Sequence, residues 1–301
     1  MCNNCPKQKK VLTILVGSFV AFIGFSILFA PAKKSERVKS TVCVSTFSLY
    51  EIAHTLAGDT FEVKPIIPLG SDAHAYSPSP SDVASISKAA LFVYSGAGFE
   101  SWAQSLKSTL PSTVTIIDMS QHVELLKEDP HYWLNIDNMI SMTETMEAEL
   151  SRISPKNKEL YRTNALAYIA ELKKLKSEYV AGLAQCKLRT LVTNHDAFGY
   201  LAHANNLKNI SIIGLSSDEQ PSAKTMANII TLVQKEKIET IFFEELIDDN
   251  VAQTIAKESG ATAKPLQPLE NISETELKSH STYLSIMRDN LTKIREAMEC
   301  R

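Results

Sequence analysis

Four residues of types that commonly bind metal ions lie in predicted loops: His74, His131, His195 and Glu270. Three imidazoles and one carboxylate suit tetrahedral zinc, whereas manganese is better served by more oxygen ligands and a higher coordination number. Affinity alone does not exclude copper or nickel. A zinc-dependent hydrolase could use the same residue types, but a catalytic zinc keeps an open position for water and needs a nearby base. Four protein ligands would close the site and indicate binding rather than catalysis.

The loop around His74 reads SDAHAYSPSPSD at residues 71–82. Pro78 and Pro80 remove two backbone donors and favour extended geometry in the residues before them, so the loop should be stiff. Ser81 or Asp82 is expected to cap the helix that follows. A stiff loop next to a strand is a good position for a metal ligand.

The first half of the chain alternates between short β-branched or apolar runs and segments with helical spacing. The pattern predicts strands at residues 41–46, 61–67, 91–94 and 114–117, with helices at 47–56, 81–88 and 100–109. Short turns between alternating strands and helices indicate a mostly parallel sheet covered by helices.

The alternation stops at residues 137–185, which have a helical pattern broken at Ser154 and Pro155. Ser154 can cap a helix and Pro155 can occupy its first position. A helix of about 30 residues is about 45 Å long, enough to run the height of a two-lobed molecule. Its predicted apolar stripe consists of Tyr161, Ala165, Tyr168, Leu172, Leu175, Tyr179 and Leu183.

The alternation returns after Cys186. Strands are expected at residues 189–193, 210–213, 240–243 and 262–265, with helices at 197–205, 222–235, 250–258 and 283–298. The fold class is therefore α/β, with two lobes, each a mostly parallel sheet flanked by helices, joined by one long rigid helix. Because ligands collect outside the carboxyl ends of parallel strands, two candidate ligands from each lobe should meet in the cleft between them.

The N-terminus differs from the rest of the chain. Three lysines precede an unbroken apolar run at residues 11–30, and two more lysines follow it. The run is longer than the apolar part of a usual signal peptide and long enough to span a bilayer, which favours an uncleaved anchor over a cleaved export signal. Cys2 and Cys5 precede the run, so the cysteine expected of a bacterial lipoprotein is missing from its usual place.

The remaining cysteines are Cys43, Cys186 and Cys300, which would then face an oxidising compartment. Their spacing does not match a zinc motif, and an odd number leaves at least one unpaired. The formal net charge of −3 over 301 residues argues against a nucleic-acid partner.

Several segments resemble the zinc/manganese solute-binding proteins of bacterial ABC importers, of the ZnuA, AdcA and TroA type (cluster A-I). They are LYEIAHTLAGD, the His74 loop, FVYSGAGFESW, DPHYWLN, TNHDAFGYLA, PLQPLEN and YLSIMRDNLTKI, in the family order from residue 41 to 298. The resemblance implies two lobes bridged by a long helix, with a metal ion held between them. His74, His131 and His195 match the first three ligand positions of the family.

The chain departs from the family pattern in places. Ala73 and Ser77 replace a proline and a glutamate beside His74, and Asn135 replaces an aspartate after His131. Many members carry an aspartate where this chain has Gln267, while AdcA-type zinc binders have a glutamate in a segment resembling LNPLEGL. Glu270 fits the second pattern and is the expected fourth ligand, with Gln267 or water as the alternative. The histidine-rich acidic loop of many zinc members is also absent.

Other polar residues have simpler interpretations. His54, His203 and His280 fit packing or solvent exposure on predicted helices. The acidic stretch Glu244, Glu245, Asp248 and Asp249 resembles a solvated helix start. Asp129, Asn194 and Asp196 could orient the ligand imidazoles or serve as helix caps.

The sequence therefore predicts the extracytoplasmic metal-binding component of an ABC import system, not an enzyme. It would capture Zn(II), or as the alternative Mn(II) or Fe(II), and deliver it to a permease driven by an ATPase subunit. A zinc-dependent hydrolase and an adhesin are the alternatives of other classes. The protein is expected to be a monomer at the periplasmic or extracytoplasmic face of the membrane, exported or N-terminally anchored. Its expected divisions are residues 1–40 (export signal or anchor and spacer), 41–153 (N-terminal lobe), 154–186 (linking helix) and 187–301 (C-terminal lobe).

Overall fold

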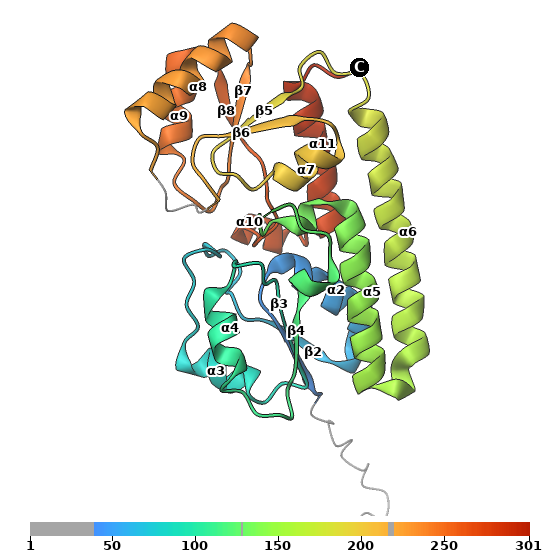
Figure 1. The fold of residues 1–301 in the computed structure, drawn as a ribbon. Helices are drawn as coiled ribbons and strands as arrows, with labels where there is room; N and C mark the ends of the chain where they lie inside the picture. Colours follow the sequence, from blue (N-terminus) through green and yellow to red (C-terminus); the bar gives the residue numbers. More distant parts are fainter. Residues whose placement is uncertain (1–38, 128, 216–219) are drawn as a thin grey trace, which may run out of the picture. The chain divides into compact units, whose positions relative to one another are not determined.

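The computed structural model describes residues 39–127, 129–215 and 220–301, and residues 39–301 form one compact unit. The predicted anchor or export segment lies outside the described residues. Within the described ranges, every helix is too short or too polar to cross a membrane. Figure 1 shows two α/β lobes and a long helix that runs beside both of them.

The N-terminal lobe is built on a four-stranded parallel sheet in the order β2-β1-β3-β4. Alternate residues of β1 serve two cores: Val42 and Val44 pack on one face of the sheet and Cys43 on the other. The strands are β1 (Thr41–Val44), β2 (Glu62–Pro65), β3 (Leu91–Tyr94) and β4 (Thr115–Asp118), and the helices are α2 (Phe47–Ala57), α3 (Pro80–Ile86) and α4 (Ser101–Lys107). Short 3-10 helices are η1 (Gly58–Thr60), η2 (Met119–His122) and η3 (Tyr132–Leu134).

The C-terminal lobe repeats this topology in the parallel order β6-β5-β7-β8. Its strands are β5 (Thr190–Thr193), β6 (Lys208–Ser211), β7 (Thr240–Phe243) and β8 (Thr262–Pro265). Its helices are α7 (Gly199–Ala204), α8 (Ala223–Glu236), α9 (Asn250–Ser259), α10 (Glu274–Lys278) and α11 (Tyr283–Ala297). The fold class predicted from the sequence is confirmed in both lobes.

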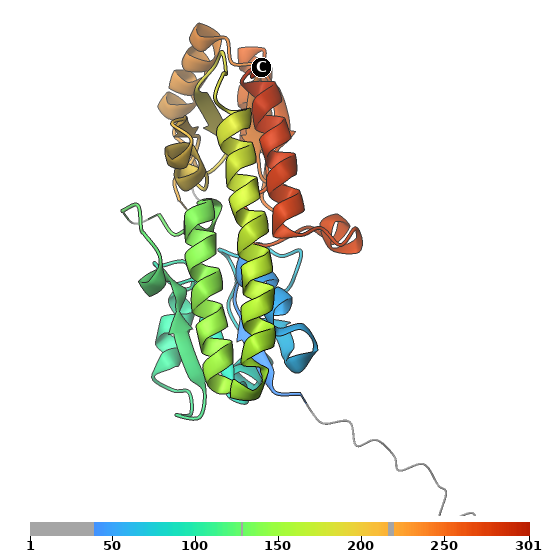
Figure 2. The same cartoon turned by 90° about the vertical axis from the view of Figure 1, so that its right-hand side faces the viewer.

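One long helix runs from the N-terminal lobe to the C-terminal lobe. Helix α5 (Ile136–Ile153) leads through η4 (Pro155–Asn157) into α6 (Lys158–Gly182), which has 25 residues and is about 37 Å long. Figure 2 shows α6 lying between α5 and α11, and it packs against both. Pro155 does take the first position of η4, but the Ser154 side chain makes no cap hydrogen bond. The predicted apolar stripe from Tyr161 to Tyr179 is buried, as is Leu183 after the helix end.

One hydrophobic core continues through both lobes. It joins the β1 face of the N-terminal sheet to α2, α5 and α6, and continues through α7 and α11 to Leu191 of β5. Hydrogen bonds between the lobes add to it: Tyr283 Oη donates to the Trp133 carbonyl at 2.7 Å. The lobes are therefore packed against each other as well as connected.

A disulfide joins Cys186, just after α6, to Cys300, just after α11. Cys43 is a free thiol inside the N-terminal sheet. Burial raises its pKa to about 11, so this thiol is a packing residue rather than a nucleophile.

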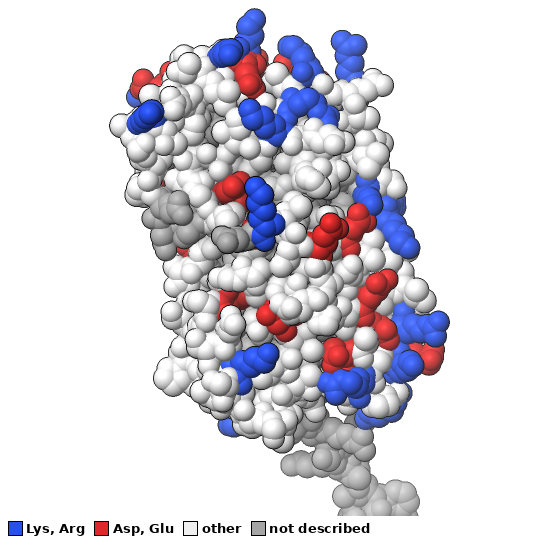
Figure 3. All heavy atoms as spheres, viewed as in Figure 1, with Lys and Arg blue, Asp and Glu red and all other residues white. Residues whose placement is uncertain are grey.

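Charged side chains of both signs share the face drawn in Figure 3. Lysines and arginines lie at the upper end of that view, over the C-terminal lobe, and again at its lower right, with acidic side chains among them. On this face the surface is mixed in charge, in keeping with the small net charge of the chain.

Candidate metal centre

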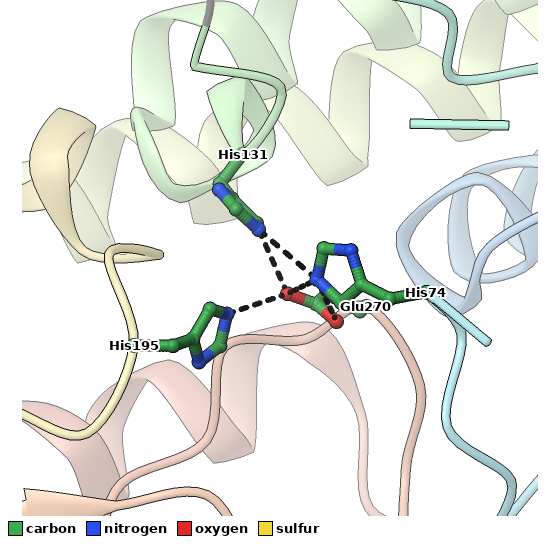
Figure 4. Close-up of side chains that lie close together, drawn as sticks. All are labelled: His74, His131, His195 and Glu270. Atoms are coloured by element: carbon green, nitrogen blue, oxygen red, sulfur yellow. Dashed lines mark hydrogen bonds and ion pairs between the residues drawn. The ribbon is translucent and has the colours of Figure 1, made fainter. Parts of the chain in front are cut away.

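The structure brings all four predicted ligands together between the lobes, where their ligand atoms lie within 4.8 Å of one another (Figure 4). Each histidine directs its Nε2 atom toward the Glu270 carboxylate. The Glu270 oxygens lie 3.2 Å from His74 Nε2, 2.9 Å from His131 Nε2 and 3.3 Å from His195 Nε2. The three ring centroids are 5.4 to 5.6 Å apart, a nearly equilateral arrangement.

These spacings match the size of a zinc coordination shell. Ligand atoms at 2.0–2.2 Å from a tetrahedral ion are about 3.3 to 3.6 Å from one another. The His74 and His131 Nε2 atoms are 3.5 Å apart. His195 Nε2 is buried and makes no aligned hydrogen bond within the described ranges. A cation among these atoms would satisfy it without large movements.

His74 lies in the loop between β2 and α3. The helix begins with a capping box, in which the Ser79 and Asp82 side chains bond each other's backbone N–H groups, and Pro80 occupies the first turn. The N-cap is therefore Ser79, and the prediction that Ser81 or Asp82 caps the helix was wrong. Closer to the ligand, Asp72 Oδ1 accepts a hydrogen bond from the His74 backbone N–H at 2.9 Å.

His131 is fully buried and precedes η3. Asp129 Oδ1 accepts hydrogen bonds from its Nδ1 at 2.8 Å and its backbone N–H at 2.9 Å, which fixes the ring with Nε2 toward Glu270. Burial lowers the pKa of His131, but the hydrogen bonds to Asp129 and Glu270 outweigh it and raise the pKa to about 9. Asp129 thus has the orienting role that the sequence allowed.

His195 follows β5, and its Nδ1 lies 3.2 Å from Glu244 Oε2. Burial lowers the pKa of His195, against the effect of Glu270. Glu244 directly follows β7, the neighbour of β5, and is 4% exposed. The interpretation of Glu244 as part of a solvated helix start is therefore wrong. Its place at the carboxyl end of a strand beside β5 was the signal that could have identified it.

The other two polar residues beside His195 act elsewhere. Asn194 Nδ2 donates to the Asp248 carbonyl at 3.2 Å. Asp196 Oδ1 accepts from Asn209 Nδ2 at 2.8 Å. Both contacts lie within the loops around the centre. The side chain that approaches the His195 ring is that of Glu244.

Glu270 is 1% exposed and lies just beyond β8. Burial raises the pKa of its carboxyl, but the charge of His74 and the close approach of the three imidazole rings outweigh burial and hold the pKa well below its usual range. Gln267, the alternative fourth ligand, is engaged differently: its Nε2 donates to Glu276 and its Oε1 accepts from the Leu269 backbone. The geometry therefore favours Glu270 over Gln267.

The walls of the centre are aromatic. The Phe99 ring lies 4.7 Å from the His74 ring, 6.1 Å from the His131 ring and 5.3 Å from the Trp133 ring. The His74 side chain is 10% exposed, compared with 0 to 2% for the other three. Solvent therefore reaches the centre from the His74 side. His54, His122, His203 and His280 are not part of the cluster.

These features define a two-lobed α/β binding protein with a buried candidate metal centre between its lobes. The chain matches the family "Zinc-uptake complex component A periplasmic" over residues 42–297 and belongs to it. The family is one of solute-binding components and not of enzymes, which argues against the hydrolase alternative.

The particular relatives are AdcA and ZnuA proteins. The chain is 33% identical to the zinc-binding lipoprotein AdcA of Streptococcus pneumoniae, over 96% of this chain and 61% of that protein. It is 30% identical to the high-affinity zinc uptake system protein ZnuA of Bacillus subtilis, over 86% and 88% of the two chains. The crystal structure of the Zn(II)-bound ZnuA-like domain of S. pneumoniae AdcA superposes with a TM-score of 0.78, at 37% identity, over 87% of this chain and 99% of that domain.

The chain spans about 61% of the length of the AdcA relatives. The similarity therefore corresponds to the ZnuA-like part of those longer proteins.

Proposed function

We propose that this protein captures Zn(II) outside the cytoplasmic membrane and delivers it to the permease of an ABC importer driven by an ATPase subunit. His74, His131, His195 and Glu270 are the proposed ligands. The observation that carries the proposal is the convergence of three imidazole Nε2 atoms on one buried carboxylate, at spacings that suit a tetrahedral ion. The zinc-related names of the AdcA and ZnuA relatives support the choice of cargo.

The donor set favours zinc over manganese or iron. Three neutral imidazoles and one carboxylate suit Zn(II), whereas Mn(II) prefers more oxygen ligands. Three of the four groups are buried, and only His74 is partly exposed, which leaves little room for the extra water ligands of a larger coordination shell. Asp129 orients the His131 ring through a hydrogen bond to its Nδ1, and Glu244 Oε2 lies 3.2 Å from His195 Nδ1 without an aligned hydrogen bond.

Binding should also release protons. The imidazole nitrogens must be deprotonated to bind the metal, and Asp129 and Glu270 favour a proton on His131 while the centre holds no cation. Zinc binding would therefore displace a proton from His131.

We assign the proposed roles to the segments predicted from the sequence. Residues 1–40 would export the protein or anchor it to the membrane, 41–153 and 187–301 would form the lobes, and 154–186 would link them. The protein would act as a monomer at the extracytoplasmic face. Its family membership supports this location.

The test is metal binding by the full-length protein. After treatment with a chelator, the protein should bind one Zn(II) in competition titrations, much more tightly than Mn(II) or Fe(II). It should show no zinc-dependent hydrolysis of ester or peptide substrates. Preferential binding of Mn(II) or Fe(II) would refute the choice of zinc, and unchanged zinc binding after replacement of His131 and His195 would refute the site.

A further inference from the structure

The segment that carries Glu270, residues 266–271, is hydrogen-bonded first to the C-terminal lobe and then to the N-terminal lobe. It leaves β8 in the C-terminal lobe, where the Leu266 N–H still donates to the Phe243 carbonyl at 2.8 Å. The next residue, Gln267, exchanges two hydrogen bonds with the Asn290 side chain of α11, at 3.1 and 2.7 Å. Up to Gln267 the chain is therefore held by the C-terminal lobe.

At Pro268 and Glu270 the backbone carbonyls accept hydrogen bonds from the N-terminal lobe. The Pro268 carbonyl accepts from Trp133 Nε1 at 2.8 Å. The Glu270 carbonyl accepts from the Phe47 N–H, at the start of α2, at 2.9 Å. Leu269 lies between these points with φ of +63° and is fully buried. The chain turns here from one lobe to the other.

Asn271 completes this attachment. Its Nδ2 donates to the Pro68 carbonyl and to the Ser71 carbonyl, both at 2.8 Å, so both amide hydrogens are used. Its Oδ1 accepts from the Ile272 N–H at 2.9 Å, and the residue is 3% exposed. Both carbonyls belong to the loop that leads to His74.

The His74 loop and the Glu270 segment are thus bound to each other at two levels. The side chains meet at 3.2 Å between His74 Nε2 and the Glu270 carboxylate. The backbones are joined a few residues away through Asn271. Loss of the Asn271 amide would remove both of these backbone attachments between the His74 loop and the segment.

We propose that Asn271 is a positioning residue that fixes the His74 loop against Glu270. As a result His74, His131 and Glu270 form one preassembled group attached to the N-terminal lobe, although Glu270 comes from the C-terminal part of the chain, and His195 is the one ligand held wholly by the C-terminal lobe. This differs from the arrangement expected from the sequence, with two ligands from each lobe. The inference rests on the proposed function for the identity of the ligands.

Two variants test it in the full-length protein. Asn271→Ala removes the two donors, and Asn271→Asp keeps the shape while placing a carboxylate oxygen against two carbonyls. Each should weaken zinc binding in chelator competition about tenfold or more, the usual effect of losing a group that orients a ligand, mainly through faster release. Asn164→Ala is the matched control, because Asn164 Nδ2 also donates to a distant backbone carbonyl, that of Leu56. The control should leave zinc affinity unchanged.

Double variants separate positioning from general stability. In a His74→Ala background, Asn271→Ala should have no further effect on zinc affinity, whereas in a His195→Ala background its effect should persist. An equal loss in both backgrounds would overturn the proposal. A lowered melting temperature with unchanged zinc affinity would also overturn it.

Hydrogen exchange in the metal-free protein makes the inference independent of the cargo. Asn271→Ala should speed amide exchange in residues 69–76 and leave α8 and α9 unchanged. Faster exchange there in a protein that binds no zinc would refute the proposed function and retain the positioning role. Unchanged exchange together with normal zinc binding would refute the positioning role alone.

Discussion

The disulfide between Cys186 and Cys300 closes a loop with a sequence separation of 114 residues, which contains the whole C-terminal sheet. In the chain-entropy account, a loop of this length restricts the unfolded chain by about 5 kcal/mol at 25 °C, and removing native disulfides typically costs 2–5 kcal/mol. We therefore expect the variant Cys186→Ser/Cys300→Ser to lose about 3 to 5 kcal/mol of unfolding free energy. This is a large share of a typical domain stability.

The double variant should still fold, since backbone hydrogen bonds join the same two segments that the disulfide links. The Arg301 N–H donates to the Gln185 carbonyl at 3.0 Å, and the Leu188 N–H donates to the Met298 carbonyl at 3.1 Å. The bond joins the chain after α6 to the chain after α11, away from the loops of the metal centre. Zinc affinity should therefore stay within about twofold of the wild type.

Urea unfolding of the metal-free protein, followed by circular dichroism, measures this effect. The transition midpoint should fall in the double variant, and wild-type protein with reductant should reach the same midpoint. Adding reductant to the variant should have no further effect. A midpoint that does not move in either case would refute the loop-entropy reasoning, and a loss of zinc binding would refute the separation of the disulfide from the site.

Three further predictions concern buried side chains. Glu270→Gln should weaken zinc binding by about 100-fold or more, because it removes the one charged ligand, whereas Gln267→Ala should change zinc affinity less than tenfold. Chelator competition compares the two variants. A larger loss for Gln267→Ala would refute Glu270 as the fourth ligand. Glu244→Gln should weaken zinc about tenfold through the His195 ring, measured in the same way, and an unchanged affinity would show that Glu244 does not support His195. Burial raises the pKa of Glu51 from 4.5 to about 7, against a hydrogen bond from the Tyr283 backbone. The folded state then binds more protons than the unfolded state, so this group's stabilisation is lost as pH rises from about 4.5 to 7. Between pH 4.5 and 7 the unfolding free energy of the wild type should fall by roughly 3 kcal/mol relative to that of Glu51→Gln, measured by urea unfolding. Parallel pH profiles of the two proteins would contradict this.

Local patterns in the sequence predicted most of the fold. The alternation of β-branched runs with helical spacing located all eight described strands, and β3, β7 and β8 have the predicted bounds. The strand expected at residues 210–213 was displaced, because β6 pairs with β5 from Lys208. Ile212 then continues beyond the strand and packs in the core of the C-terminal lobe. Register depends on the neighbouring strand, which a single segment does not reveal.

The ligand set could also be predicted, since each ligand lies in a recognisable local motif in a loop: His74, His195 and Glu270 follow strands, and His131 precedes η3. The groups that hold the ligands could not. Asn271 bonds carbonyls 203 and 200 residues away, and Glu244 approaches His195 only because β7 pairs with β5. Helix α10 was also missed, since its five residues are defined by the Ser273–Glu276 capping box rather than by an apolar period.

The shared core limits how metal binding can be coupled to movement. Wide separation of the lobes would expose the core between α6 and α11 and break the hydrogen bonds of Tyr179 with Met287 and of Tyr283 with Trp133. Both hydroxyls are buried, so an opened state would have to satisfy them with water. Smaller changes at the loops avoid this loss. His195 follows β5, and the Glu244 carboxylate beside its ring follows β7 of the same lobe. A shift of the β5 and β7 ends would therefore move His195 while His74, His131 and Glu270 stay together. Zinc release would then need only a local movement in an otherwise rigid protein.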